Sequence, residues 1–302
     1  MKDHIQTLMK LLDFPADAQS FYIDFFEKLT PSDIDFFKAM QSEYFMEHSD
    51  NEAAVNDYVY KTLGEYACEK GFEPHGFYML FLLYCSKKLK KYYKEKGYGE
   101  EMYINLMKDL YVKNNECKRI HKVWGTMTFL WFHRHFLGRL FALGRFQFEK
   151  IKLWEPYEKA GVALTANDTV YNIHIPALGP LNKEIRFDSY KKAFRFFGFK
   201  KGDKMPIVCE SWLLYPENKN IYDVNSNLYA FMNDFDIISG GEYETAFKDA
   251  WRVFGMDFDG DTKKLPQNTS LQKNIAKWLS NGKTIGYGHG IIIFDGEKII
   301  NK

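Results

Sequence analysis

His174 is the side chain in this sequence that is best placed to do chemistry. It lies on the polar side of residues 170–175, where apolar and polar residues alternate as in a half-buried strand. Pro176 follows it directly, and a Gly179-Pro180 break comes soon after. A histidine at the carboxyl end of a strand, above a loop that opens a helix, lies where α/β sheets place their ligands. It can serve as a general base near neutral pH, and the alternative is a hydrogen-bonded structural histidine.

The next predicted strand, residues 206–214, adds a carboxylate to this picture. Its alternation puts Glu210 and Trp212 on one side and Cys209 and Ser211 on the other. A histidine and a carboxylate on adjacent strands form a polar pair, which favours an enzyme. Cys209 is expected to be a buried, inert thiol rather than a nucleophile.

Standard catalytic signatures are missing from the sequence. There is no GxSxG elbow, Walker loop, HExxH motif or GxGxxG sequence that opens a helix. We predict no metal site, because His133 and His135 would point apart on a helix and residues 257–261 lack the carboxylate that ends a calcium loop. The glycine-rich segment 286–290 is similar to a phosphate-cradling loop, but it precedes a strand. Close backbone packing explains its glycines equally well, and His289 within it is a second candidate base.

Length and charge exclude several classes of protein. The chain has 302 residues, of which 46% are hydrophobic and 27% charged, as in globular proteins. A net charge of +1 gives no general attraction to nucleic acid or anionic lipid, so the lysine-rich segment 87–94 is interpreted as the solvated end of a helix. The longest apolar run, residues 77–85, is too short to span a membrane, and the N-terminus lacks the apolar region of a secretory signal. Four scattered cysteines favour reduced thiols in a cytoplasm.

Helices dominate the first part of the chain, and strands alternate with helices in the second. We predict a helical domain over residues 1–115 and a mixed α/β domain over residues 116–302. The predicted helices cover about residues 19–29, 31–40, 52–70, 77–94, 99–112, 117–135, 189–197, 227–233 and 270–279, and the predicted strands about residues 143–149, 170–175, 206–214, 236–239 and 290–294.

A set of short motifs in the second half carries a family likeness. They are residues 140–149, His174-Ile175-Pro176 with Gly179-Pro180-Leu181, Cys209 with residues 211–214, and further matches at residues 226–227, 252–255 and 269–272. Together they resemble the bacterial acyltransferase domain-containing proteins, which pair a helical N-terminal domain with a C-terminal domain similar to GNAT N-acyltransferases. The resemblance implies an α+β fold in which the second domain is GNAT-like, with a mixed, mostly antiparallel sheet.

The resemblance also implies a reaction, the transfer of an acyl group from acetyl-CoA or another acyl-CoA to a small-molecule or peptide amine. The amine would attack the thioester directly, with His174 or Glu210 as the base and a backbone N–H near His174 as the oxyanion donor. Tyr222 or Tyr229 would protonate the departing thiolate. The residues implied in binding the acyl-CoA are Ile175, Ala177, Leu178, Gly179, Ser211 and Asn227. Nucleic-acid and membrane partners are not implied.

The loop that would hold the CoA pyrophosphate departs from the GNAT pattern. GNAT loops read [RQ]xxGx[GA], whereas residues 174–181 have no leading arginine or glutamine, and Pro180 removes one backbone N–H. The alternative function is therefore a non-catalytic, GNAT-like binding module that has lost this loop. Its helical half would then be a platform for a partner or ligand.

Overall fold

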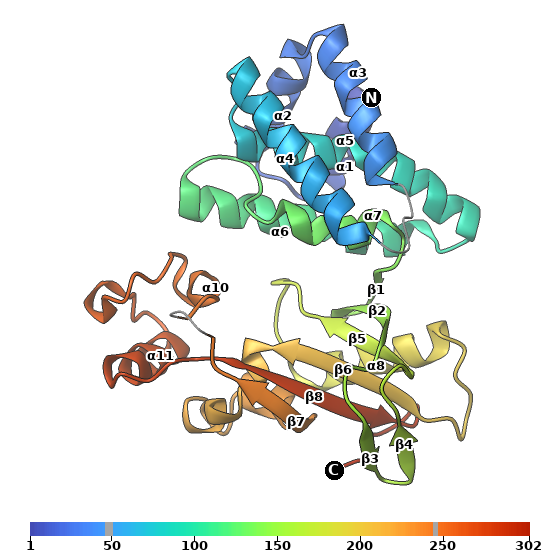
Figure 1. Cartoon of the computed structure of the whole chain (residues 1–302), viewed down its shortest axis with the longest axis vertical. Coiled ribbons are helices and arrows are strands. Elements are labelled where there is room, and N and C mark those ends of the chain that lie inside the picture. Colours follow the sequence, from blue (N-terminus) through green and yellow to red (C-terminus); the bar gives the residue numbers. More distant parts are fainter. Residues whose placement is uncertain (46–50, 244–246) are drawn as a thin grey trace. The chain divides into compact units, whose positions relative to one another are not determined.

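The chain folds as two compact units. The computed structural model describes residues 1–45, 51–243 and 247–302, and it divides into Met1–Ala142 and Leu143–Lys302 (Figure 1). The division lies later than the boundary expected after residue 115. The reason is that the segment up to Ala142 belongs to the helical core, in which Phe129, Phe132 and Leu140 are buried.

The first unit is built around one buried helix. Its elements are α1 (Lys2–Leu11), α2 (Ala16–Lys28), α3 (Pro31–Tyr44), α4 (Glu52–Lys70), α5 (Pro74–Lys96), α6 (Glu100–His121), the 3-10 helix η1 (Phe129–Phe132) and α7 (His133–Phe136). Residues 76–86 of α5 are all buried, as the apolar run in the sequence predicts, and α4 and α6 pack on either side of it. Thr30 caps α3 in a capping box with Asp33, as expected from Thr30 followed by Pro31. The single helix predicted over residues 117–135 is wrong, because Cys117 lies within α6, which ends at His121.

The second unit contains a six-stranded mixed sheet in the order β1-β2-β5-β6-β8-β7. Its strands are β1 (Phe141–Leu143), β2 (Phe146–Lys152), β5 (Thr169–His174), β6 (Met205–Ser211), β7 (Asp236–Gly241) and β8 (Tyr287–Phe294), and β3 (Tyr157–Lys159) pairs with β4 (Val162–Leu164) as a separate hairpin. β5 and β6 are parallel, whereas β2/β5, β6/β8 and β7/β8 are antiparallel. The predicted fold class, a helical domain followed by a GNAT-like α/β domain with a mostly antiparallel sheet, is confirmed.

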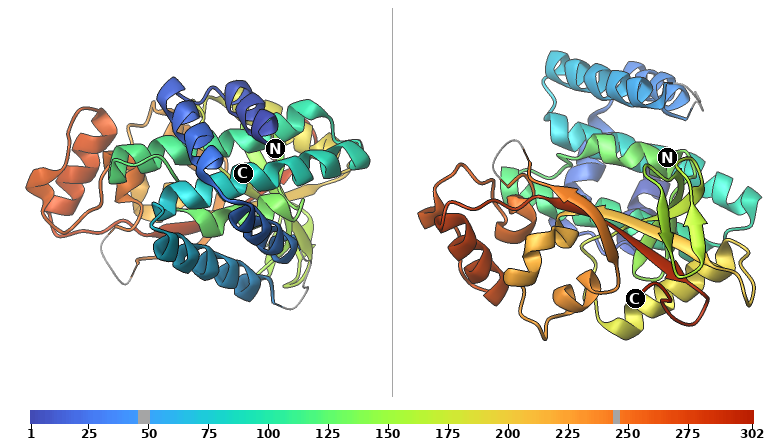
Figure 2. Two further views of the ribbon diagram at one scale, coloured as in Figure 1. Left: turned by 90° about the horizontal axis from the view of Figure 1, so that it is seen from above. Right: turned by 60° about the horizontal axis from the view of Figure 1, so that its bottom comes forward.

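The two faces of this sheet are covered differently. Helix α8 (Lys183–Phe196; yellow in Figure 2) packs on one face, where Tyr190 stacks on Phe146 with ring centroids 5.6 Å apart. On the opposite face, a small core that includes Val208 and Ile291 is covered by Tyr157 and Val162 of the β3–β4 hairpin. The hairpin therefore protects the apolar end of that face.

Three predicted boundaries differ from the structure. The strand predicted over residues 143–149 is interrupted, because Gly144 and Arg145 form a turn between β1 and β2. Helix α8 begins at Lys183 rather than at residue 189, since the Asn182 side chain caps it by accepting from Ile185 N. The strand predicted to reach residue 214 ends at Ser211, whose hydroxyl caps the following 3-10 helix η2 (Trp212–Leu214).

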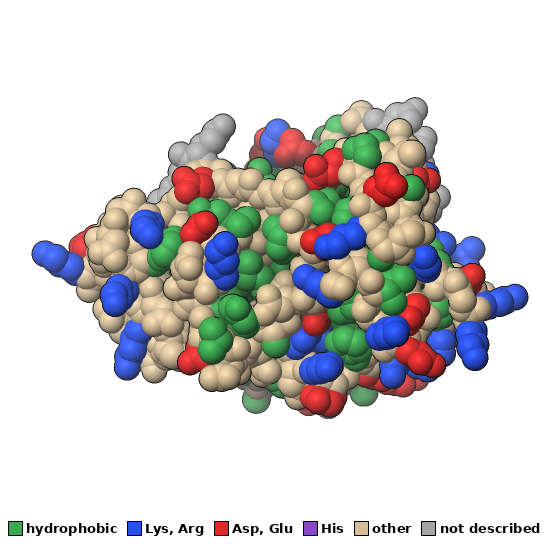
Figure 3. Space-filling model, turned by 90° about the horizontal axis from the view of Figure 1, so that it is seen from below, with side chains coloured by type: hydrophobic (Ala, Val, Ile, Leu, Met, Phe, Trp, Pro, Cys, Tyr) green, Lys and Arg blue, Asp and Glu red, His purple; other side chains and the backbone are tan. Residues whose placement is uncertain are grey.

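The remaining elements surround the sheet. They are η3 (Pro216–Asn220), α9 (Asn227–Met232), α10 (Ala250–Phe254), η4 (Thr262–Lys264) and α11 (Ser270–Ser280). Within the described residues, no helix is long and apolar enough to cross a membrane. All four cysteines are free, and three of them are buried. On the face drawn in Figure 3, basic and acidic side chains are interspersed, with small groups of hydrophobic side chains between them.

Candidate active site

The parallel strands β5 and β6 separate toward their carboxyl ends. Among the described residues, the ladder between them consists of two pairs, Tyr171 with Ile207 and Asn172 with Val208. β6 nevertheless stays paired with β8 as far as Ser211. Backbone groups at the ends of β5 and β6 therefore border an opening in the sheet instead of bonding to each other.

A row of polar side chains crosses the sheet beside this opening. Residues paired across a ladder point to the same face, so the register assigns these side chains to the face opposite α8. The row consists of Gln147 and Glu149 on β2, Asn172 and His174 on β5, Glu210 on β6, His289 on β8 and Ser239 on β7. His174 and Glu210, the predicted polar pair, thus lie on the two strands that flank the opening.

His174 is held by a carboxylate on one side of the opening. Its Nε2 lies 2.6 Å from Glu149 Oε1, and the Asn172 amide donates to the same oxygen at 3.2 Å. The side chains of His174 and Glu149 are only 14% and 12% exposed. Because a carboxylate oxygen only accepts, Nε2 carries a proton, and the lone pair of the neutral imidazole is on Nδ1. This pairing orients the ring as the buried carboxylate orients histidine in hydrolase triads.

Gln147 is a buried amide with unused hydrogen-bonding capacity. It lies directly opposite His174 in the β2/β5 ladder and is 1% exposed. Neither its Oε1 nor its Nε2 has a hydrogen-bond partner among the described residues. Buried amides are rarely left unpaired, so this one points to a water or ligand next to His174.

A second histidine and carboxylate lie on the other side of the opening. His289 Nε2 is 3.0 Å from Glu210 Oε2, and the Glu210 side chain is 62% exposed. Ser239 Oγ lies 3.0 Å from His289 Nδ1 and donates to Glu155 Oε1 at 2.6 Å. The opening is therefore flanked by an acid–base pair on each side.

The loop between β5 and α8 is clamped by arginine side chains. Arg145 donates from Nε to the Pro180 carbonyl at 3.1 Å and from Nη2 to the Gly179 carbonyl at 3.0 Å. Arg186 donates to the next carbonyl, that of Leu181. The φ of Gly179 is +117°, a conformation that favours glycine, and its side-chain position is open. The carbonyl groups of residues 179–181 thus all point toward the two arginines. Because the N–H of a trans peptide points opposite to its C=O, the N–H groups of Leu181 and Asn182 point away from the arginines.

One nitrogen of the Arg145 guanidinium is not used in holding this loop. Its Nη1 is buried and has no hydrogen-bond partner within the described part of the chain. Burial lowers the pKa of Arg145 to about 10, which still leaves it charged at neutral pH. An anion at the loop would satisfy this donor and the first N–H groups of α8 together.

A buried ion pair joins the first turns of α8 to the segment that follows α9. Arg186 is 2% exposed and bonds Asp234 through both Nε and Nη2, at 2.6 and 3.0 Å. Tyr190 donates to the same carboxylate at 3.1 Å. The Asp234 carboxylate raises the pKa of Arg186 against the opposing effect of burial. These contacts fix the start of α8, and with it the end of the loop.

Family models account for nearly the whole chain. A model described as a GNAT-like C-terminal domain matches residues 140–292, half of the sequence. This chain belongs to the GNAT-like C-terminal domain family. A second model, described as an N-acyltransferase N-terminal domain, matches residues 3–138. The family that the sequence motifs resemble is thereby confirmed.

Solved structures share the fold of this GNAT-like protein at low sequence identity. An acyltransferase mutant in complex with octanoyl-CoA matches with a TM-score of 0.68 and 16% identity, over 97% of this chain and 88% of that one. An acyltransferase in complex with decanoyl-CoA matches with a TM-score of 0.68 and 18% identity, over 96% and 87%. A further one, in complex with decanoyl-CoA and teicoplanin, has a TM-score of 0.60 and 17% identity, over 96% and 99%. A search of curated proteins finds no match.

The predicted acyl-CoA residues of the GNAT-like unit occupy two kinds of position. Ala177, Leu178 and Gly179 are exposed on the loop that Arg145 clamps, and Ile175 before them is half-buried. Ser211 ends β6 at the opening, where its hydroxyl accepts from Leu213 N at 3.1 Å. Asn227, the first residue of α9, is exposed.

The two predicted acids differ in accessibility. Tyr222 is buried, its hydroxyl accepts from the Asn218 amide at 2.9 Å, and it lies 3.4 Å from the Leu213 carbonyl. Burial raises the pKa of Tyr222 far above its usual value. Tyr229 is half-buried on the short helix α9. The hydroxyl of Tyr222 is thus already used within the protein.

The glycine-rich segment proves to be part of a strand rather than a phosphate loop. Tyr287 to Phe294 form β8, and a Cβ added at Gly288 would lie 2.0 Å from the Leu214 carbonyl oxygen. Close backbone approach therefore explains this glycine. Cys209 is buried, and burial raises the pKa of its thiol far above the usual range, as expected for an inert core residue.

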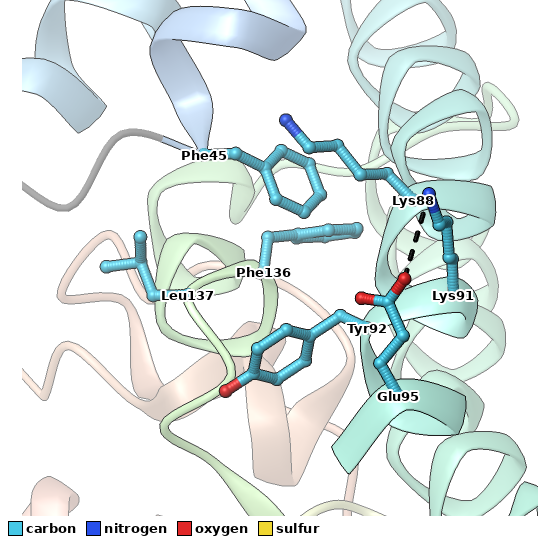
Figure 4. A pocket seen from close by; sticks show the side chains of 7 residues that line it. All are labelled: Phe45, Lys88, Lys91, Tyr92, Glu95, Phe136 and Leu137. Atoms are coloured by element: carbon cyan, nitrogen blue, oxygen red, sulfur yellow. Dashed lines mark ion pairs between the residues drawn. The ribbon is translucent and has the colours of Figure 1, made fainter.

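The helical unit contains a separate pocket of about 310 Å³ (Figure 4). It is lined by Phe45, Lys88, Lys91, Tyr92, Glu95, Phe136 and Leu137. Lys88 Nζ lies 4.4 Å above the Phe45 ring, and Lys91 pairs with Glu95 at 3.7 Å. Aromatic walls with a net positive rim suit an apolar ligand that carries a negative group. None of these side chains is a cysteine, serine or histidine.

Four residues that build the site are not predicted from the sequence. The sequence indicates Glu149, Gln147 and Ser239 only as polar members of strands, and it predicts Arg145 inside a strand. The alternation of polar residues did signal one polar face, but the partner of each residue depends on a register that pairs distant segments.

Proposed function

We propose that this protein is an N-acyltransferase that moves an acyl group from acyl-CoA to a small-molecule or peptide amine. The observation that carries the proposal is the opening between β5 and β6 with His174 held by Glu149 at its edge. His174 lies beside the point where β5 and β6 stop pairing, the kind of position at which open α/β sheets bind ligands, and this supports the role of a base.

The acyl-CoA would enter through this opening. Its pyrophosphate would lie on the loop of Ile175, Ala177, Leu178 and Gly179, with Nη1 of Arg145, which has no partner among the described residues, as an additional donor. Ser211 and Asn227 would contact the remainder of the co-substrate. Pro180 supplies no N–H, but its carbonyl is turned toward Arg145 and so does not oppose an anion. We propose medium-chain acyl-CoA as donor in the first instance, because structural relatives are described with octanoyl- and decanoyl-CoA, and acetyl-CoA as the alternative.

The chemistry needs little covalent help from the protein. The amine nitrogen forms a bond to the thioester carbon, and the bond from that carbon to sulfur breaks. His174 takes the proton of the attacking nitrogen at Nδ1 while Glu149 stabilises the imidazolium. Backbone N–H groups of β5 near His174, freed where the strands diverge, stabilise the oxyanion. We assign protonation of the thiolate to Tyr229, because the Tyr222 hydroxyl is already bonded to Asn218.

The proposal is tested by turnover with octanoyl-CoA and a panel of primary amines. Thiol release and the mass of the amide product report the reaction. We expect His174→Gln to lower kcat by about 10²–10⁴-fold with an unchanged thermal melt, since that is the usual contribution of a general base. His121→Gln, an exposed histidine in the helical unit, is the matched control. Full activity of His174→Gln would overturn the assignment of the base.

The second candidate function is a ligand-binding module. The observation that favours it is the pocket beside Phe45 and Phe136 in the helical unit, whose aromatic walls and basic side chains suit an apolar anion. This candidate predicts that CoA compounds leave the thermal melt unchanged. Either function suits a reducing compartment such as the cytoplasm, given four free cysteines.

A further inference from the structure

His289 belongs to a chain of polar contacts that the reaction above does not use. Hydrogen bonds link His289 through Ser239 to Glu155, and Glu210 lies within ion-pair distance of His289 at the other end. Three of its members come from different strands, and Glu155 lies between β2 and β3. Because the four residues come from four separate segments, the tertiary fold brings them together, and no single local turn does.

The hydrogen bonds of Ser239 fix the tautomer of His289. A serine hydroxyl has one proton, and Ser239 gives it to Glu155 Oε1 at 2.6 Å. Ser239 Oγ must therefore accept from His289 Nδ1, which lies 3.0 Å away. In the neutral imidazole the lone pair is then on Nε2. That atom is buried, without a hydrogen-bond partner among the described residues, and 3.0 Å from Glu210 Oε2.

The local fold holds this arrangement in place. A β-bulge in β7 between Ile237 and Ser239 shifts the register so that Ser239 lies opposite His289. Bulges of this kind re-aim side chains and are common near active sites. The ring of Trp154 lies 4.9 Å from the imidazole, and the Trp154 N–H donates to Glu155 at 3.1 Å.

The acceptor of the proposed reaction must lose two protons. A primary amine is an ammonium ion at neutral pH, and it becomes a nucleophile only after the first proton leaves. The second leaves when the amide forms. His174 takes the second proton, so the first must go to another acceptor, either solvent or a second side chain.

We propose that Glu210 receives the acceptor as its ammonium ion and passes the first proton to His289. This inference rests on the proposed function. The exposed carboxylate of Glu210 binds the cation, the N–H bond of the ammonium breaks, and the proton ends on Nε2 of His289. The free amine is left to attack the thioester. Glu210 is the residue that touches the substrate, and His289 is a positioning residue that acts through it.

Two carboxylates lie close to the His289 imidazole. Glu210 faces it from β6, and Glu155 lies behind Ser239. The other titratable neighbours are Tyr287, with ring centroids 5.4 Å apart, and Tyr243, which packs on Tyr287. A proton received on Nε2 would therefore lie beside the Glu210 carboxylate, with Glu155 behind Ser239.

Two acceptors of nearly the same shape test the inference. Benzylamine is an ammonium ion at pH 7, whereas phenylhydrazine is uncharged and has no first proton to lose. With octanoyl-CoA as donor, we expect His289→Gln and Glu210→Gln to lower kcat/KM for benzylamine by about 10²-fold and for phenylhydrazine by less than about threefold. His174→Gln should reduce both. Glu158→Gln, an exposed carboxylate on β3, is the matched control and should change neither.

The outcomes separate this inference from the proposed function. Equal losses for the two acceptors in His289→Gln, or no loss for either, would overturn the role of His289. A wild-type protein that acylates neither compound would contradict the proposed function itself, and this inference with it. The tautomer is tested independently by ¹⁵N NMR of the histidine rings, with His289→Gln to assign the signal. We expect the neutral ring to carry its proton on Nδ1, and a proton on Nε2 would overturn the relay.

Discussion

Replacing Arg145 tests whether its hydrogen bonds hold the loop before α8 in the conformation that binds the CoA pyrophosphate. The guanidinium donates to the carbonyl groups of Gly179 and Pro180, and its Nη1 has no partner in the part of the chain that the structure describes. Arg145→Ala removes both hydrogen bonds, so the loop must be ordered when acyl-CoA binds. We expect weaker binding of the co-substrate with little change in the chemical step.

The size of the effect follows from the two bonds. A hydrogen bond from a charged donor contributes about 1.5–3 kcal/mol. Arg145 is only partly buried, so we take the lower value for each bond, or about 3 kcal/mol in total. Since about 1.4 kcal/mol is a tenfold change, the Kd for CoA should rise about 100-fold. Arg145→Lys can bond one carbonyl and should raise the Kd about tenfold.

Calorimetric titration with CoA and steady-state kinetics with octanoyl-CoA measure this effect. We expect KM for the donor to follow the Kd, while kcat at saturating donor stays within about threefold. Arg195→Ala, an exposed cation near the end of α8, is the control for lost charge. A Kd for Arg145→Ala within threefold of the wild-type value would refute the clamp, as would a loss confined to kcat.

Three further changes test other parts of the structure. Gln147→Leu removes a buried amide that has no partner within residues 1–45, 51–243 and 247–302, so the free energy of unfolding should stay equal or rise by up to about 1–3 kcal/mol while turnover falls. An unchanged turnover in kinetic assays would show that the amide binds nothing. Asp234→Asn leaves Arg186 buried without its charge partner and should cost about 3–5 kcal/mol in urea unfolding, and a loss below about 1 kcal/mol would contradict this. Burial, and then Lys87 and Lys90, lower the pKa of His4 to about 4 from 6.5. The unfolded chain therefore binds a proton that the folded protein does not, and the free energy of unfolding should fall as pH drops from 6.5 to 4. His4→Gln should flatten that part of the pH curve, and parallel curves for the two proteins would refute the assignment.

The sequence is enough to predict which side chains share a face of the central strands. Alternation at residues 170–175 predicts Asn172 and His174 on one side, and the structure places both in contact with Glu149. The sequence also predicts the cap at Thr30 and the buried part of α5, because caps and helical core positions depend on neighbours in the sequence.

The rest of the site could not be predicted, because it depends on pairing between distant segments. Glu149 meets His174 only through the register of β2 on β5. Ser239 meets His289 only because a bulge shifts β7. Arg145 reaches the loop from a turn, although the alternation of residues 143–149 predicts a continuous strand. Gly144, which has a positive φ, is the residue in this segment that favours a turn.

Binding of octanoyl-CoA is the measurement that tests the central claim most directly. A thermal melt with octanoyl-CoA and with free CoA reports whether the opening between β5 and β6 and its loop hold the co-substrate. A ligand at 100 times its Kd stabilises the fold by about 2.7 kcal/mol, which raises Tm by several degrees. We expect a rise with both compounds and a smaller rise for Arg145→Ala. An unchanged Tm with both would contradict an acyltransferase and favour the ligand-binding module.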